Sequence, residues 1–163
     1  MCMTELMKND DCGIRAMSEM ATSIVREHFD PLIGKAQNDY MLSLFQTESS
    51  IKEQLENGSR YFFVRDADRN VGFLAFYPKE HGMYISKFYL YKTERGKGYA
   101  HKMLDYVINE AKKAGKNCIE LNVNKRNSAC QVYEHLGFRI IRSVKNDIGH
   151  GFFMDDYVYR LDI

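Results

Sequence analysis

The sequence predicts an α/β fold with a mixed sheet of about six or seven strands and helices on both faces. Three observations predict it. Apolar and aromatic runs separated by turn signals indicate strands, first between residues 61 and 91 and again from residue 118 onward. A helical pattern at residues 98–114 follows a glycine-containing turn between two of these strands. Further helical patterns precede the first strand, so helices are available for each face of the sheet.

The composition fits one domain. The chain has 163 residues, of which 45% are apolar, and this suffices for a core. The formal net charge of +1 disfavours nucleic acid and anionic membranes as partners. No apolar run approaches the length of about 18 residues that spans a bilayer, and the N-terminus shows no secretory signal. We therefore expect a single domain over residues 1–163 in the cytoplasm.

The cysteines predict no metal site. Four are present at irregular spacing, and none forms a CxxC pair: Cys2, Cys12, Cys118 and Cys130. Reduced thiols in a cytoplasm fit this pattern better than zinc ligands or disulfides.

The first third of the chain predicts helices. Ser18–Phe29 shows an apolar helical face and predicts a helix that Ser18 caps. Asp39–Phe45 and Glu48–Leu55 show shorter helical patterns. Pro31 and Pro78 lie between patterned segments, as expected of boundaries.

Three strands are predicted next. Tyr61–Arg65 and Val71–Tyr77 are rich in aromatic and β-branched residues, and the largely polar residues 66–70 between them indicate a hairpin turn. A second turn at residues 80–82 leads into a longer strand, Met83–Tyr91. This order favours an antiparallel meander.

The helix that opens at Gly98 has the most regular pattern in the chain. Its apolar residues recur at helical spacing and form one stripe: Ala100, Met103, Leu104, Val107, Ile108 and Ala111. Lys112 and Lys113 lie in its last turn, where they favour the helix dipole. Gly115 then supplies a left-handed stop.

The last third predicts a strand, a short helix and two further strands. Apolar and polar residues alternate over 119–123, which indicates a strand. Asn127 can cap a short helix that Gly137 ends. The remaining predicted segments are a strand at Phe138–Val144, a loop at Lys145–Gly151 and a strand at Phe152–Leu161.

The turn before the long helix is the candidate functional site, and it reads Arg95-Gly96-Lys97-Gly98-Tyr99-Ala100. A strand that turns through glycines into a helix exposes N–H groups at the positive end of the helix dipole, where phosphates bind. Arg95 and Lys97 add positive charge, so a pyrophosphate is the expected ligand. A tight connection with no ligand is the alternative. The pattern matches neither the GxxxxGK(S/T) of nucleotide P-loops nor the GxGxxG of dinucleotide sites.

Two segments resemble the signatures of the GNAT N-acetyltransferases. Arg95, Gly98 and Ala100 match the pattern (Q/R)xxGx(G/A), and residues 127–138 resemble NxxAxxxYxxxGF with the alanine one residue early. The element order resembles the family over the whole chain, most strongly from Met83 to Val144. The N-terminal third and the C-terminal end are loosely similar to PaiA-type polyamine acetyltransferases.

The resemblance implies a GNAT-like fold and an enzyme, an acetyl-CoA-dependent N-acetyltransferase that passes the acetyl group directly to a primary amine without a metal. Main-chain amides of the turn would hold the pyrophosphate of acetyl-CoA. Backbone groups around Phe88 and Leu90 would pair with the pantetheine arm where the fourth and fifth strands separate, and the Leu90 N–H would polarise the thioester carbonyl. The cofactor-binding residues implied are Phe88, Leu90, Arg95, Gly96, Lys97, Gly98, Tyr99, Ala100 and Asn127.

Tyr133 is the catalytic residue that the resemblance implies, as the proton donor to the leaving thiolate. A plain core tyrosine is the alternative, because Tyr133 lies on the apolar stripe of its helix. Asn127 would hydrogen-bond the pantetheine arm, which is compatible with capping. The general base is open. The strand Met83–Tyr91 has no Asp or Glu, which leaves a water relay or Glu120 as alternatives.

The acceptor implied is a small-molecule primary amine, with a polyamine among the candidates. Five acids could line an anionic route for a polycation or be solvated surface: Glu48, Glu53, Glu56, Asp155 and Asp156. A protein or peptide amine is an alternative acceptor. A CoA-binding sensor or interaction module without turnover is the alternative function, because the strand lacks a carboxylate. Exposed strand edges near the C-terminus favour a homodimer.

Overall fold

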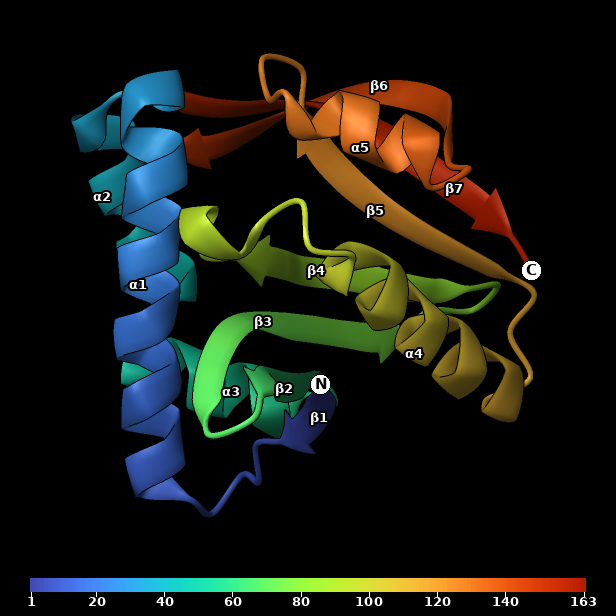
Figure 1. Cartoon of the computed structure of the whole chain (residues 1–163). Helices are drawn as coiled ribbons and strands as arrows, with labels where there is room; N and C mark the ends of the chain where they lie inside the picture. Colours follow the sequence, from blue (N-terminus) through green and yellow to red (C-terminus); the bar gives the residue numbers. More distant parts are fainter. The chain divides into compact units, whose positions relative to one another are not determined.

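A computed structural model describes residues 1–163, with seven strands and five α-helices. The strands form one mixed sheet in the order β1-β2-β3-β4-β5-β7-β6 (Figure 1). This confirms the predicted fold class. The strands are β1 (Cys2–Glu5), β2 (Arg60–Asp66), β3 (Arg69–Pro78), β4 (Met83–Leu90), β5 (Cys118–Asn124), β6 (Arg139–Gly149) and β7 (Phe152–Asp162). The helices are α1 (Asp11–Ile33), α2 (Lys35–Phe45), α3 (Glu48–Glu56), α4 (Tyr99–Lys113) and α5 (Ala129–His135).

The chain divides into two compact units. The first comprises Met1–Tyr77 and Lys87–Met103, and the second Pro78–Ser86 and Leu104–Ile163. Strand β4 and helix α4 therefore contribute residues to both units. A single domain over residues 1–163 stays a prediction.

Helix α1 begins at Asp11, and the predicted start at Ser18 is wrong. Its N-cap is Asp10, whose carboxylate accepts a hydrogen bond from the Gly13 N–H at 2.9 Å. Ser18 lies inside the helix, where its hydroxyl donates to the carbonyl oxygen of Gln46 at 2.6 Å. The cap lies among polar residues without apolar periodicity, which is why the pattern misses the first turns. The predicted apolar face is buried: Ile14, Met17, Met20, Ala21, Ile24, Val25 and Phe29.

Helix α1 continues through Pro31, which the sequence placed at a boundary, and ends before Gly34. Pro31 has no N–H to donate to the carbonyl oxygen four residues earlier, so it removes one intrahelical hydrogen bond, and the helix ends two residues later at Ile33. Gly34 turns the chain with a φ of 87°, and α2 begins at Lys35 rather than at the predicted Asp39.

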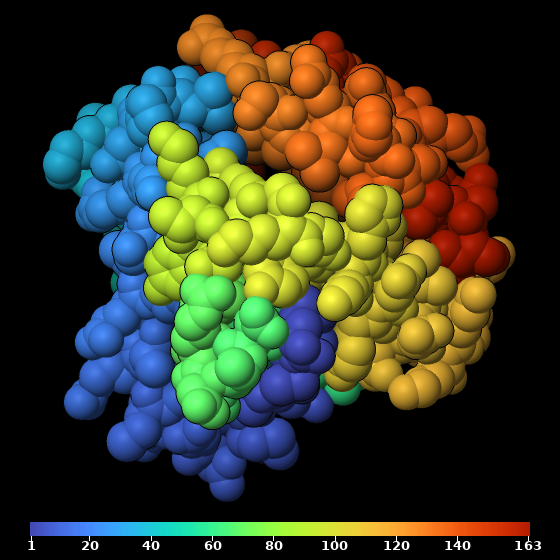
Figure 2. Space-filling model, in the orientation of Figure 1, coloured from blue at the N-terminus to red at the C-terminus, as the bar shows by residue number.

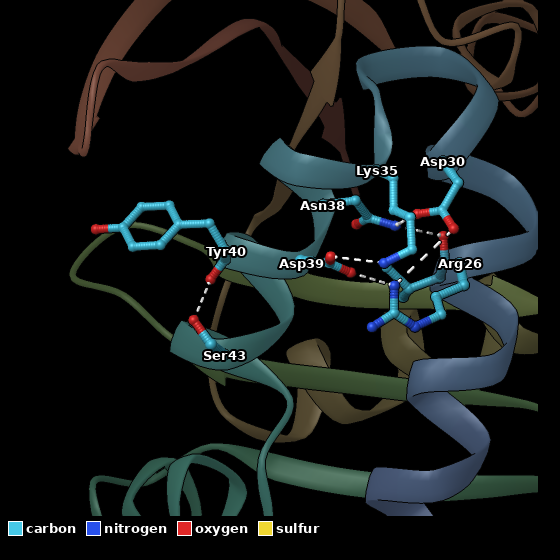
Figure 3. Close-up of polar contacts among 8 residues, drawn as sticks. Arg26, Asp30, Lys35, Asn38, Asp39, Tyr40 and Ser43 are labelled. Carbon is cyan, nitrogen blue, oxygen red and sulfur yellow. Dashed lines mark hydrogen bonds and ion pairs between the residues drawn. The ribbon is translucent and has the colours of Figure 1, made fainter.

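Polar side chains hold α2 beside α1 at this junction (Figure 3). Asn38 is fully buried, and its amide donates to the carboxylate of Asp30 at 2.7 Å. Asp39 forms ion pairs with Arg26 and with Lys35, the second at 2.8 Å. These contacts order residues that carry no apolar periodicity, so the sequence predicts the start of α2 too late.

Helices cover both faces of the sheet in the first unit. Helices α1, α2 and α3 pack on the face that carries Tyr61, Phe73 and Ala75. The side chains on the opposite face are equally buried, and Phe62, Leu74 and Phe76 are at most 1% exposed. The hydroxyl of Tyr99 in the first turn of α4 donates to Asp66, which strand alternation places on this opposite face.

Strand β1 is absent from the predicted elements. It pairs antiparallel with β2, from Cys2 opposite Arg65 to Glu5 opposite Phe62. Its residues are mostly exposed, so they show no apolar alternation. The N-terminal ammonium lies 3.6 Å from the Asp66 carboxylate, and Figure 2 shows the N-terminus (dark blue) beside the β2–β3 turn (green).

In the second unit, the start of β4 pairs in parallel with β5, from Met83 opposite Ile119 to Ile85 opposite Leu121. Strand β5 then pairs antiparallel with β7, and β7 with β6. No helix in the structure combines the length and the apolar character needed to cross a membrane.

Strands β6 and β7 form a long hairpin, so the loop predicted at Lys145–Gly151 is wrong. Strand β6 extends to Gly149, and His150 and Gly151 turn the chain with φ of 53° and 76°. Most residues of β6 are exposed, so its second half shows the polar composition of a loop.

Gly72 in β3 permits the close approach of β4. A Cβ atom at this position would lie closer than 3.0 Å to the carbonyl oxygen of Tyr89. We predict that Gly72→Ala lowers the free energy of unfolding by about 1–3 kcal/mol, because the added methyl meets backbone rather than a movable side chain. Denaturant unfolding measures the change. Asn70→Ala, at an exposed position of the same strand, should stay within about 0.5 kcal/mol of the wild type. Equal stability of Gly72→Ala and the wild type would contradict the close approach.

Candidate functional site

The candidate phosphate-binding turn joins β4 to α4. A short 3₁₀ helix, Lys92–Glu94, follows β4. Gly96 and Gly98 have φ of 77° and 82°, a region that glycine enters without strain. A Cβ at either position would meet nothing within 4 Å, so the space beside the main chain is open. The turn has the backbone shape that its glycines predict.

The amides of this turn have no acceptor within the chain. No main-chain or side-chain hydrogen bond uses the N–H groups of Gly96, Lys97 or Gly98. They directly precede α4, a helix of 15 residues, whose positive dipole end adds to their partial charge. An array of free amides at a helix start can hold a phosphate or another anion.

Glu94 holds the turn in place through ion pairs with two cations. It is only 5% exposed, and its carboxylate accepts from the guanidinium of Arg69 at 2.5 and 3.3 Å and from the ammonium of Lys97 at 2.9 Å. The hydrogen bonds from Arg69 lower the pKa of this carboxyl group below its ordinary value. In Figure 2 the turn before α4 (yellow-green) and the β2–β3 turn (green) lie side by side, as the ion pair between Arg69 and Glu94 requires.

Glu94 is not among the site residues that the sequence predicts. The available signal was an acid flanked by three cations, Lys92, Arg95 and Lys97. Local sequence could not show that the distant Arg69 completes the site.

Both predicted cations of the turn contact other protein groups. The ammonium of Lys97 is bound to Glu94, and the guanidinium of Arg95 lies 3.4 Å from Nδ1 of His28. The main-chain amides are therefore the groups of the turn that are left without a protein partner.

Tyr99 fixes the first turn of α4 to the sheet. Its side chain is 8% exposed, and its hydroxyl donates to the carboxylate of Asp66 at 2.5 Å. This hydrogen bond raises the pKa of Tyr99 and lowers that of Asp66. Ala100 is half-buried in the same turn. The side chain of Tyr99 is thus an anchor for the helix, and only its main chain borders the turn.

Phe88 and Leu90 occupy the end of β4, where both are half-buried. Leu90 lies against Gly72, and the next residue, Tyr91, donates its N–H to the carbonyl oxygen of Val71 at 3.0 Å. This end of β4 is therefore held against β3. Pairing of Phe88 and Leu90 with a pantetheine arm stays a prediction.

Asn127 orders the start of α5. It is 8% exposed, and its side-chain oxygen accepts from the Ala129 N–H at 2.9 Å. Its own carbonyl oxygen accepts from the Cys130 N–H at 3.1 Å. The N-cap of α5 is Ser128, which makes no side-chain capping hydrogen bond, so the predicted cap at Asn127 is wrong and Asn127 instead orders the turn that precedes the helix. Contact of Asn127 with a cofactor stays a prediction.

The ring of Tyr133 belongs to an aromatic group on α5 and β7. It meets Phe138 edge-on with ring centres 5.8 Å apart, and Tyr159 at 6.2 Å. Tyr133 is half-buried, whereas Tyr159 is fully buried and donates its hydroxyl to Glu134 at 3.1 Å. The neighbouring rings restrict the orientation of the Tyr133 phenol.

Three further titratable groups are relevant to the identity of the general base, which the sequence leaves open. Glu120, one of the predicted alternatives, faces Arg160 at 3.9 Å. Burial lowers the pKa of Lys87 on β4 to about 8, and its ammonium lies 5.7 Å from the centre of the Phe45 ring. Burial also raises the pKa of Asp156 on β7, an acid that is only 3% exposed.

The predicted site residues fall into two groups. Phe88, Leu90 and residues 95–100 belong to the first unit, and Asn127 and Tyr133 to the second. No group of three or more His, Cys, Asp or Glu side chains is arranged to hold a metal ion.

Comparison with solved structures shows acetyltransferases of the same fold. The PaiA N-acetyltransferase from Thermoplasma acidophilum in complex with coenzyme A aligns over 100% of both chains, with 12% identity and a TM-score of 0.77. A GCN5-related N-acetyltransferase from Rhodopseudomonas palustris aligns over 99% of this chain and 95% of its own, with 11% identity and a TM-score of 0.79. The aminoglycoside 6'-N-acetyltransferase from Enterococcus faecium aligns over 99% and 97%, with 15% identity and a TM-score of 0.68.

The match to a family model is stronger evidence of family membership than the low sequence identities to these solved structures. The model for the acetyltransferase (GNAT) domain matches residues 31–154, which include the glycine turn, Asn127 and Tyr133. No curated protein matches the sequence. The family and the enzyme class predicted from the two signatures are confirmed: the chain belongs to the GNAT acetyltransferase domain family and is an N-acetyltransferase.

Proposed function

We propose that the protein transfers the acetyl group of acetyl-CoA directly to a primary amine of a small molecule. One observation carries the proposal: the amides of Gly96, Lys97 and Gly98 lack acceptors and stand at the start of α4. The diphosphate of a coenzyme supplies the anion that such a turn can hold. Family membership makes acetyl-CoA the fitting donor.

The turn fits a diphosphate through its main chain. The two glycines have no Cβ, and open space lies beside them, so phosphate oxygens can approach the amides closely. Arg95 and Lys97 already contact His28 and Glu94, so they contribute a positive surrounding rather than the primary ligands. Glu94 supports the turn by keeping the ammonium of Lys97 on its flank.

We assign the binding of the thioester end of acetyl-CoA to residues of β4 and α5. The main chain at Phe88 and Leu90 would pair with the pantetheine arm, and the Leu90 N–H would stabilise the negative charge that develops on the carbonyl oxygen. Asn127 would hydrogen-bond the arm. Tyr133 would give its proton to the thiolate that leaves, a role suited to a phenol whose orientation is restricted by Phe138 and Tyr159.

A small-molecule acceptor is favoured by the neighbouring folds. The aligned structures include a PaiA N-acetyltransferase and an aminoglycoside 6'-N-acetyltransferase, so polyamines and aminoglycosides are the first compounds to try. A CoA-binding module without turnover is the second candidate function. It is favoured by the absence of an acid on β4 and by the engagement of Glu120 with Arg160.

A panel of acceptors separates these functions. Release of coenzyme A from acetyl-CoA is measured with polyamines, aminoglycosides, amino acids and peptides. Turnover with a small amine supports the proposal, and turnover with peptides alone favours a protein acceptor. Binding of coenzyme A in calorimetry without transfer to any amine would favour the module without turnover. Absence of binding would overturn the assignment of the turn.

Replacement of Tyr133 tests the proton donor. We predict that Tyr133→Phe lowers kcat by about 100-fold, because the thiolate then leaves without a positioned acid. The affinity for acetyl-CoA, measured by calorimetry, should remain within about twofold because the ring is retained. Tyr157→Phe, next to the same aromatic group, is the matched control and should keep its kcat. An unchanged kcat in Tyr133→Phe would remove this residue from the mechanism.

Replacement of Glu94 tests the support of the turn. We predict that Glu94→Gln raises the KM for acetyl-CoA by about threefold or more, with a smaller change in kcat. The variant should also melt at a lower temperature at neutral pH, since the ionised carboxylate is held by Arg69 and Lys97.

The pH dependence of melting has a definite sign. The folded protein lowers the pKa of Glu94, so its stabilisation is full above the ordinary value of 4.5 and is lost as the pH falls through the folded value. The difference in melting temperature between the wild type and Glu94→Gln should therefore become smaller at acidic pH. Glu5→Gln removes another carboxylate paired with an arginine, in β1, and should leave KM unchanged. An unaltered KM in Glu94→Gln would show that the turn needs no such support.

A further inference from the structure

Asp156 is an acid in an unusual position. It lies on β7, opposite Asn124 of β5, and is 3% exposed. No ion pair joins it to any cation of the chain. A carboxylate removed from water without a cation is costly, so proteins seldom keep one that has no role.

The groups around Asp156 leave its charge uncompensated. Lys125 is a cation whose charge lowers the pKa of Asp156, but its ammonium lies 3.0 Å from Asp155 and 5.3 Å from the centre of the Tyr157 ring. Asn122 offers a neutral hydrogen bond, and on β6 the residue opposite Asp156 is the apolar Val144. The negative charge of the adjacent Asp155 and the burial both raise the pKa of Asp156, and burial is the larger cause.

Strand alternation separates this acid from the proposed proton donor. Asp156 lies on the same face of the β5–β7 pair as Asn122 and Asn124. Tyr159, three residues along, lies on the opposite face, where its ring meets that of Tyr133.

We propose that Asp156 is a catalytic residue that binds the ammonium group of the acceptor and removes its proton. The assignment rests on the proposed function. A primary ammonium supplies the cation that the buried carboxylate lacks. Glu120, on the same face of β5, is a poorer candidate because Arg160 faces it.

The reaction balances with these groups. The ammonium passes one proton to the Asp156 carboxylate, and the resulting amine attacks the acetyl carbon. A C–N bond forms, the C–S bond breaks, and the thiolate takes the proton of Tyr133. The second proton lost by the nitrogen restores Tyr133 through solvent, and Asp156 releases its proton to water. Burial raises the pKa of the Asp156 carboxyl group above its ordinary value, which makes its carboxylate a stronger base for this proton transfer.

The test compares three proteins with the panel amine that has the highest kcat/KM. We expect Asp156→Asn to lower kcat/KM for the amine by about 100-fold or more, while calorimetry shows unchanged affinity for acetyl-CoA. Asp162→Asn is the matched control on the same strand and face, and its carboxylate is paired with Arg139 and Arg160. Its kcat/KM should equal that of the wild type.

Two further readouts distinguish a base from a structural residue. The acidic limb of the pH profile of kcat/KM, assigned to Asp156, should be present in the wild type and absent in Asp156→Asn. The variant should also melt above the wild type at neutral pH, since it removes an unpaired buried charge. This gain in melting temperature should vanish below pH 3.8, the ordinary pKa of an aspartate, because the carboxyl group of Asp156 is then protonated in both the folded and the unfolded chain. A lower melting temperature would mean a structural role and overturn the assignment.

Failure of this assignment is distinguishable from failure of the proposed function. A wild-type protein that acetylates no amine contradicts the proposed function, and the role of Asp156 falls with it. A wild-type protein that acetylates an amine, together with an Asp156→Asn variant of equal kcat/KM, overturns the role of Asp156 alone. Asp156→Glu, which keeps a carboxylate, should recover part of the lost activity.

Discussion

The pairing of one buried carboxylate with two cations holds the candidate site in shape. Glu94 joins Arg69, from the start of β3, to Lys97, inside the glycine turn. Two glycines with left-handed backbones would otherwise leave this turn among the loosest parts of the chain. The side-chain ion pairs fix its position, and the main-chain amides stay available. Structural support and ligand binding are thus divided between different groups of one short segment.

Local sequence patterns predict those elements whose structure is determined by residues close together in the sequence. The stripe from Ala100 to Ala111 identifies α4, and Gly96 and Gly98 identify the turn before it, because helical period and left-handed backbone are properties of neighbouring residues. Two local signatures, at residues 95–100 and 127–138, sufficed to identify the family.

Elements ordered by distant partners were missed or misplaced. Strand β1 is held by pairing with β2, and α2 starts at Lys35 because buried polar contacts join it to α1. The second half of β6 is a strand only because β7 pairs with it. The unusual character of Glu94 and Asp156 depends on burial, which no short window of sequence records. Long-range contact is the common physical reason.

The exposed outer strand has a consequence for solubility. Strand β6 is the last in the sheet, so one row of its main-chain hydrogen-bonding groups has no further strand of this chain to pair with. Such an edge can recruit other chains into aggregates. Charged side chains recur along it at Arg139, Arg142, Lys145 and Asp147. Their hydration, and the repulsion between the cations of two such edges, oppose pairing of this strand with the same strand of another chain.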